Sequence, residues 1–103
     1  MNRKPFIISV SIPLKPGAAN EFLALLNDVF DAMKVEEAFV NATALRSADD
    51  PDTIVLVETW LDRDDFMSEQ LKRLYRQLYE ARLPEILRTP RILSFYEPIR
   101  RVP

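Results

Sequence analysis

The chain contains no cysteine and no histidine, and its only glycine is Gly17. The missing residues exclude disulfide bonds, iron–sulfur clusters, histidine-ligated haem, the usual zinc sites, and Ser-His-Asp or Cys-His catalysis. A single glycine cannot form a glycine-rich phosphate-binding loop. Any metal would have to be a hard cation on carboxylates. The acidic run at residues 49–52 does not match the spacing of an EF-hand, so we expect no metal site.

Long hydrophobic runs are absent as well. The first apolar segment, residues 6–12, is interrupted by serines and is too short to span a bilayer. It lacks a small-residue cleavage site, so it does not resemble a signal peptide. We therefore expect a cytoplasmic protein with no membrane partner. The net charge of −2 gives no reason to expect a nucleic-acid-binding surface.

The composition that remains is that of one globular domain. The 103 residues are 48% hydrophobic and 29% charged, and a chain of this length is typical of a single core. No internal repeat or linker divides the sequence. We expect residues 1–103 to form a single domain.

The hydrophobic pattern predicts alternating strands and helices. Strands are predicted over residues 6–14, 39–47, 53–61 and 91–97. An apolar stripe predicts a helix over residues 18–33. A second helix, with room for a kink, is predicted from the N-cap Asp62 through Tyr79, and Pro84 is expected to end or restart it. The order βαββαβ predicts a ferredoxin-like α+β fold with an antiparallel four-stranded sheet.

Residues 53–61 form the strongest predicted strand, and both of its faces are largely apolar. A strand of this kind needs a covering layer on each side. The helices of so short a chain can cover one face only. We therefore expect a second copy of the chain to cover the other face, which predicts a homodimer.

Four short pieces of sequence form a more specific pattern between residues 6 and about 66. They are Lys15-Pro16-Gly17 after the first strand, Glu21-Phe22 in the first helix, Arg46-Ser47-Ala48-Asp49-Asp50-Pro51, and Val57-Glu58-Thr59-Trp60 followed by Asp62. The most specific of them is the Glu-x-Trp at the end of a buried strand. Together they resemble the antibiotic biosynthesis monooxygenase (ABM) family of dimeric α+β barrels.

The resemblance implies a homodimer with its two sheets face to face, and a pocket in each protomer between sheet and helices. Enzymes of this family oxidise multi-ring phenols, anthrones or quinols with O₂ and no cofactor. The implied function is a cofactor-independent monooxygenase acting on a small aromatic molecule. The haem-degrading relatives use an Asn on the first strand and a His on the second helix, and this chain has neither. The alternative is a non-enzymatic dimeric domain that binds a small ligand.

Three residues are candidates for catalysis, each with a structural alternative. Glu58, beside an apolar pocket, would have a raised pKa and act as a base; alternatively, it would pair with an arginine or lie at a solvated barrel rim. Trp60, the only tryptophan, would stack on a planar substrate or simply close the core. Arg82 falls within the apolar stripe of the second helix and would bind a phenolate or carboxylate. Alternatively, Pro84 would fray this turn and release Arg82 to solvent.

Four further residues are candidates for substrate binding. The amide of Asn41 would orient a substrate oxygen, or would satisfy a hydrogen bond at the sheet edge. Phe66, Tyr75 and Tyr79 lie on the apolar side of the predicted second helix, where the usual role of such residues is core packing. The basic residues of this helix that lie off the stripe are expected on its solvated surface: Lys72, Arg73 and Arg76.

Overall fold

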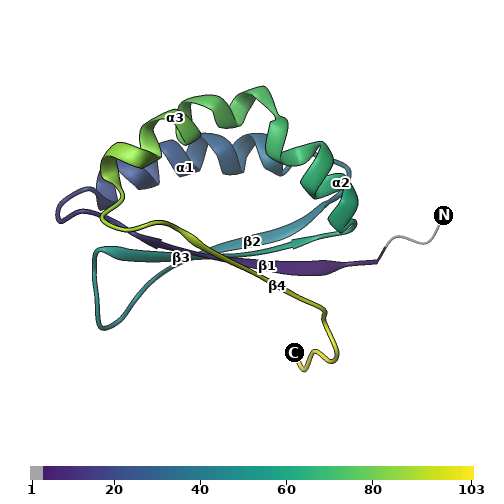
Figure 1. The fold of residues 1–103 in the computed structure, drawn as a ribbon. Coiled ribbons are helices and arrows are strands. Elements are labelled where there is room, and N and C mark those ends of the chain that lie inside the picture. The colour runs from purple at the N-terminus through teal and green to yellow at the C-terminus, as the bar shows by residue number, and fades with distance from the viewer. Residues whose placement is uncertain (1–3) are drawn as a thin grey trace.

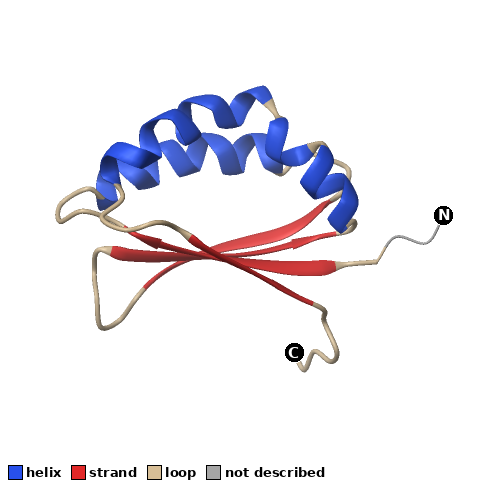
Figure 2. Cartoon of the chain, in the orientation of Figure 1, coloured by secondary structure: helices blue, strands red, loops and turns tan. Residues whose placement is uncertain are grey.

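The computed structural model describes residues 4–103 and has two layers, a four-stranded antiparallel sheet and helices on one of its faces (Figures 1 and 2). The strands are β1 (Phe6–Pro13), β2 (Phe39–Arg46), β3 (Thr53–Trp60) and β4 (Ile92–Tyr96), in the sheet order β2-β3-β1-β4. The helices are α1 (Ala19–Met33), α2 (Arg63–Ser68) and α3 (Gln77–Ile86), with the 3₁₀ turns η1 (Gln70–Lys72) and η2 (Leu74–Arg76). The predicted ferredoxin-like α+β fold is confirmed. Residues 1–3, part of the predicted domain, lie outside the described residues.

The helix-facing side of the sheet carries the core. On β3 the even-numbered positions Ile54, Leu56, Glu58 and Trp60 are buried, which confirms the predicted alternation of this strand. The predicted stripe of α1 is also confirmed, since its apolar residues pack into the same core. The buried residues of the α1 stripe are Phe22, Leu26, Val29 and Met33.

No helix among residues 4–103 is long and apolar enough to cross a membrane.

The opposite face of the sheet has no helices over it (Figure 1). Its central part comes from the odd-numbered residues of β3 and β1, including Val55, Val57 and Ile7. Ile92 and Tyr96 of β4, which are 63% and 53% exposed, lie on the same face because they pair with β1 positions of that face. An antiparallel sheet tolerates one solvated face, but this face is rich in apolar side chains. It therefore stays the predicted interface with a second copy.

Substitution of Val57 by lysine tests this interface. Val57 lies mid-strand on the open face of β3, so a charge there should prevent two sheets from packing together. We expect the parent to sediment as a dimer at micromolar concentration and Val57→Lys to sediment as a 12.0 kDa monomer. Val35→Lys is the control, because Val35 is 80% exposed in the loop after α1. A monomeric parent would contradict the prediction.

The predicted second helix is broken into four pieces. Its predicted apolar side is confirmed for Phe66 and Tyr79, which are buried, but is wrong for the residues between them. Asp62 caps α2 as expected, with its carboxylate accepting from the backbone N–H of Asp64 and Asp65. The backbone then departs from helical geometry at Glu69 (φ −117°) and becomes extended at Arg73 (φ −60°, ψ 139°). Each departure rotates the residues that follow relative to an unbroken helix with 3.6 residues per turn.

The breaks reverse which side chains face the sheet. Leu74 and Leu78, which an unbroken helix would place on its apolar stripe, are 78% and 70% exposed, whereas Gln70 and Arg76 are buried. Pro84 neither ends nor restarts a helix, since α3 continues past it to Ile86. Regular periodicity therefore describes α1 but fails between residues 69 and 78.

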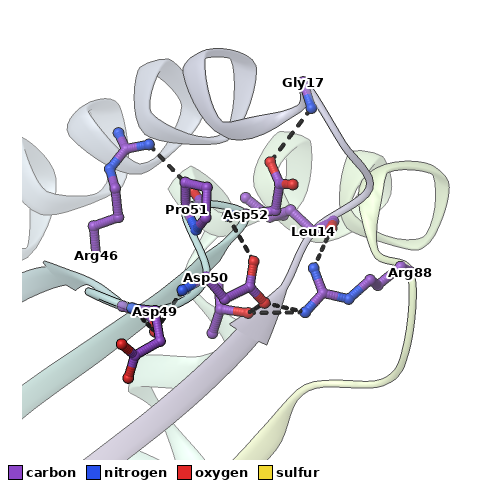
Figure 3. A network of polar contacts seen from close by, with 10 residues as sticks. Leu14, Gly17, Arg46, Asp49, Asp50, Pro51, Asp52 and Arg88 are labelled. Carbon is purple, nitrogen blue, oxygen red and sulfur yellow. Dashed lines mark hydrogen bonds and ion pairs between the residues drawn. The ribbon is translucent and has the colours of Figure 1, made fainter.

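The β2–β3 turn is tied to the rest of the chain by a polar network (Figure 3). The carboxylate of Asp50 accepts from the backbone N–H of Asp52 at 3.0 Å and from the hydroxyl of Thr53 at 2.7 Å. The guanidinium of Arg88, which follows α3, donates to Asp50 at 2.6 Å and to the carbonyl of Leu14 at 2.8 Å. These contacts give a structural reason for the Asp49-Asp50-Pro51 motif, because the turn fastens the segment before β4 to the end of β1.

Replacing Asp50 by asparagine should lower the melting temperature at neutral pH. The hydrogen bonds from Thr53 and Asp52, and the Arg88 guanidinium, hold the pKa of Asp50 below its ordinary value of 3.8. The stabilisation is therefore present above pH 3.8 and is lost as pH falls through the lowered pKa. Melting curves of the parent and Asp50→Asn should differ at neutral pH and converge in acid. Asp49→Asn, at an exposed neighbouring position, should melt like the parent.

Candidate active site

A small cavity of about 40 Å³ lies between the sheet and the second helical segment, where the resemblance implied a pocket. Three strand residues form its apolar wall: Ile8, Val10 and Leu56. Phe66 of α2 and Leu71 of η1 close the helix side. The cavity is thus bounded by the regular sheet on one side and by the broken helix on the other.

Glu58 places a carboxylate in this apolar wall. Its position on β3 is in the helix-facing row, and the residue is only 4% exposed. The indole N–H of Trp60, two residues along the same face, donates to Glu58 Oε1 at 2.9 Å. Burial raises the pKa of Glu58, and the hydrogen bond from Trp60 and the charge of Arg76 only partly oppose this effect. A carboxylate with these properties is suited to holding and exchanging a proton.

Arg76 brings a positive charge to the same cavity from η2. It is 7% exposed, and its Nε and Nη2 atoms are buried with no hydrogen-bond partner. The guanidinium carbon lies 5.8 Å from the ring centroid of Phe66 and 5.7 Å from that of Tyr75. A continuous helix would have put Arg76 on the solvated surface, and no motif in the sequence marks it. Only the irregular turns bring it inside.

Tyr79 and an ion pair complete the polar lining. Tyr79 is buried, its ring centroid lies 5.8 Å from that of Phe22, and burial raises the pKa of its hydroxyl. Arg91 donates to both carboxylate oxygens of Glu80, at 3.1 and 2.8 Å. This bidentate pair joins α3 to the residue before β4 at the edge of the cavity.

Both the sequence and the fold of this chain are matched by known proteins. The family model for antibiotic biosynthesis monooxygenase matches residues 5–86. A protein of Pestalotiopsis microspora named "Putative monooxygenase GME11364" is 31% identical over 90 residues, covering 86% of this chain and 75% of that protein. The chain belongs to the antibiotic biosynthesis monooxygenase family.

Solved structures share the fold of this family member. Rv0793 from Mycobacterium tuberculosis superposes with a TM-score of 0.85 at 21% identity, over 97% of this chain and 100% of that one. SnoaB from Streptomyces nogalater, described as a cofactor-independent oxygenase, superposes with a TM-score of 0.82 at 18% identity, over 97% and 98% of the two chains. At these identities the likeness shows the fold alone.

The predicted aromatic residues of this ABM protein take different positions. Phe66 lines the cavity, as does Tyr79. Trp60 does not, because its ring is fully buried between Phe39 and Phe66, with both centroids at 5.2 Å. Its link to the cavity is the hydrogen bond to Glu58. Tyr75 does not line the cavity either, but it adjoins Arg76, and its hydroxyl is buried with no partner.

Two more predicted site residues, Asn41 and Arg82, also lie outside the cavity. A β-bulge between Phe39 and Asn41 changes the face of β2, so Asn41 pairs with Thr59 on the open side of the sheet. Arg82, predicted to point inward, is 41% exposed and pairs with Glu21 of α1 and with Glu85. The broken helix accounts for Arg82, since it shifts the inward face of α3 to Tyr79, Leu83 and Ile86.

A second, larger hollow of about 350 Å³ lies between the start of β1, the start of α2 and the end of β4. Its side chains include Phe6, Phe95 and Arg63, whose guanidinium carbon stacks 4.2 Å from the Phe95 ring centroid. The charged residues around it are exposed or half-buried, and none of them is a buried unpaired group. Among residues 4–103, no three carboxylates are arranged to hold a metal ion. The chemistry therefore concentrates in the smaller cavity.

The buried state of Glu58 predicts a distinctive pH dependence of stability. The folded chain retains the Glu58 proton to higher pH than the unfolded chain, where glutamate titrates near 4.5. This contribution is fully present below pH 4.5 and is lost as pH rises through the raised pKa. Glu58→Gln keeps an acceptor for Trp60 and cannot ionise. The unfolding free energy of Glu58→Gln should therefore increase relative to that of the parent as pH increases.

Chemical denaturation at a series of pH values above and below 4.5 measures this difference. Glu69→Gln is the matched control, since it makes the same change at an exposed position, between α2 and η1. A constant difference between Glu58→Gln and the parent at every pH would show that Glu58 titrates normally in the folded protein.

Proposed function

We propose that this protein is a cofactor-independent monooxygenase that oxidises an aromatic molecule, such as a polycyclic phenol, anthrone or quinol, with O₂. The observation that carries the proposal is that a buried carboxylate, Glu58, and a buried cation, Arg76, both line one apolar cavity. One group can accept a proton and the other can stabilise the anion that results. These are the functions that oxidation of an electron-rich phenol by O₂ requires from a protein.

In the proposed reaction, Glu58 in its ionised form removes a proton from the substrate. The raised pKa makes it a stronger base than an exposed glutamate. Arg76 stabilises the aromatic anion, which transfers one electron to O₂. The substrate radical and superoxide then combine into a peroxide. The peroxide anion takes back the proton held by Glu58. The carbon that carries the hydroperoxide then loses its remaining hydrogen as a proton while the O–O bond breaks, and the departing hydroxide leaves with that proton as water. A new carbonyl forms, so each O₂ yields one oxidised substrate and one water.

The remaining lining residues have supporting roles in this proposal. Phe66 and Tyr79 contact the ring system of the substrate. Trp60 acts on Glu58 through the hydrogen bond to Oε1 and orients the carboxylate. SnoaB, which shares the fold, is described as a cofactor-independent oxygenase, and this agrees with a site that uses side chains alone.

The size of the cavity places a condition on the reaction. A volume of about 40 Å³ is far below that of pockets that enclose drug-sized ligands. A multi-ring substrate must therefore displace part of the lining. The sheet wall is held by continuous backbone pairing, whereas Leu71 and Arg76 come from the two 3₁₀ turns. We place substrate entry at this side.

Oxygen consumption tests the proposal. The chelator-treated protein should consume O₂ with at least one member of an anthrone and quinol panel. Glu58→Gln should reduce the rate by about 10²–10⁴-fold, the usual contribution of a general base. Glu69→Gln should leave it unchanged. Activity that needs added flavin, haem or metal, or a fully active Glu58→Gln, would refute the proposed chemistry. Saturable binding of panel members without turnover would favour the ligand-binding alternative.

A further inference from the structure

Among residues 4–103, Arg76 is the one arginine whose side chain is buried, and no carboxylate accepts a hydrogen bond from it. Arg73 pairs with Glu36, Arg82 with Glu21, and Arg91 with Glu80. Each of these three is at least 28% exposed, so water can also satisfy its N–H groups. Arg76, which is 7% exposed, has neither a partner nor water access at Nε and Nη2. A folded protein seldom leaves buried charged donors unsatisfied.

The two unpaired atoms have a specific geometry. Nε–H and Nη2–H lie on the same edge of the guanidinium plane and point in parallel directions. This edge binds a planar group with two coplanar acceptor oxygens through two parallel hydrogen bonds. A single-atom acceptor, such as chloride, satisfies only part of it.

The surroundings of the guanidinium limit what can occupy this edge. The flanking rings of Phe66 and Tyr75 favour a flat group. The hydroxyl of Tyr75 lies close enough to Arg76 for the guanidinium to act on its pKa, but Tyr75 itself does not line the cavity. Glu58, which lines the same cavity, already accepts from Trp60 through Oε1.

We propose that the free edge of Arg76 is a subsite for a planar oxyanion with two coplanar oxygens, carried by the ligand of this cavity. The inference deepens the proposed function, because it names the group by which the substrate is recognised. Two chemical sources supply such a group. One is an aromatic carboxylate, and the other is a ring that carries a hydroxyl next to a carbonyl and ionises to a shared anion.

Nuclear magnetic resonance of the ¹⁵N-labelled protein tests the subsite directly through the side-chain Nε–H signal of Arg76. Benzoate represents the carboxylate source and tropolonate the hydroxy-carbonyl source. Chloride at the same ionic strength is the single-atom control. We expect both or one of the planar anions to shift the Arg76 signal saturably, and chloride to leave it in place. Whichever of benzoate and tropolonate binds more tightly identifies the chemical source of the planar group.

Two variants test whether binding depends on the parallel Nε–H and Nη2–H donors of Arg76 or only on its positive charge. Arg76→Lys keeps the charge and removes the parallel donors, so it should weaken the tighter anion by about tenfold or more. Arg73→Lys makes the same change three residues away, at a position outside the cavity lining, and should leave the affinity within about twofold. Thermal unfolding checks that both variants remain folded.

Several results would overturn the proposal. They are an Arg76 signal that neither planar anion moves, an equal shift with chloride, or equal affinity in Arg76→Lys. If Arg76→Lys fails to fold, the titration of the parent protein decides. None of these measurements requires turnover. If an anion binds at Arg76 but no panel member supports O₂ consumption, the subsite is supported and the proposed reaction is refuted. If O₂ is consumed but no anion binds at Arg76, the proposed reaction is supported and the subsite is refuted.

Discussion

Burial of the Glu58 carboxylate in the helix-facing row of β3 is the constraint on which the rest of the site depends. Strand alternation leaves this side chain no exit to solvent, because its neighbours in the row are Leu56 and Trp60. A buried carboxylate needs hydrogen bonds and a nearby positive charge. Trp60 supplies the first from the same strand, and Arg76 supplies the second from the layer above. The fold thereby places a proton-exchanging group inside an apolar cavity.

The breaks in the second helix bring Arg76 into the layer above the buried carboxylate of Glu58. A regular helix would turn leucines toward the sheet and arginine toward water. The two 3₁₀ turns do the opposite, since Arg76 is buried and Leu74 is 78% exposed. Local preference and tertiary position therefore conflict in this segment. Conflicts of this kind concentrate at functional sites, where a specific arrangement of polar groups takes precedence over the most stable packing.

The two walls of the cavity differ in regularity, because one belongs to the sheet and the other to the helical layer. Continuous antiparallel pairing holds the sheet wall of the cavity, and the Asp50–Arg88 network fastens the turn at its far end. The helical wall is built from short pieces joined by an extended residue at Arg73. A sheet wall with Glu58 and an irregular wall with Arg76 suit the proposed site, in which a ligand enters while Glu58 keeps its position.

The sequence by itself was sufficient for the family, the βαββαβ order, the α1 stripe and the shared strand face of Glu58 and Trp60. These features depend on local periodicity and on short motifs, and neighbouring residues alone determine them. The positions of Arg76, Arg82 and Asn41 were decided by the tertiary structure. A one-residue bulge moves Asn41 to the other face of the sheet, and two irregular turns exchange Arg82 for Arg76 at the cavity. Such interruptions arise where packing between layers outweighs local propensity, and no pattern along the chain records that balance.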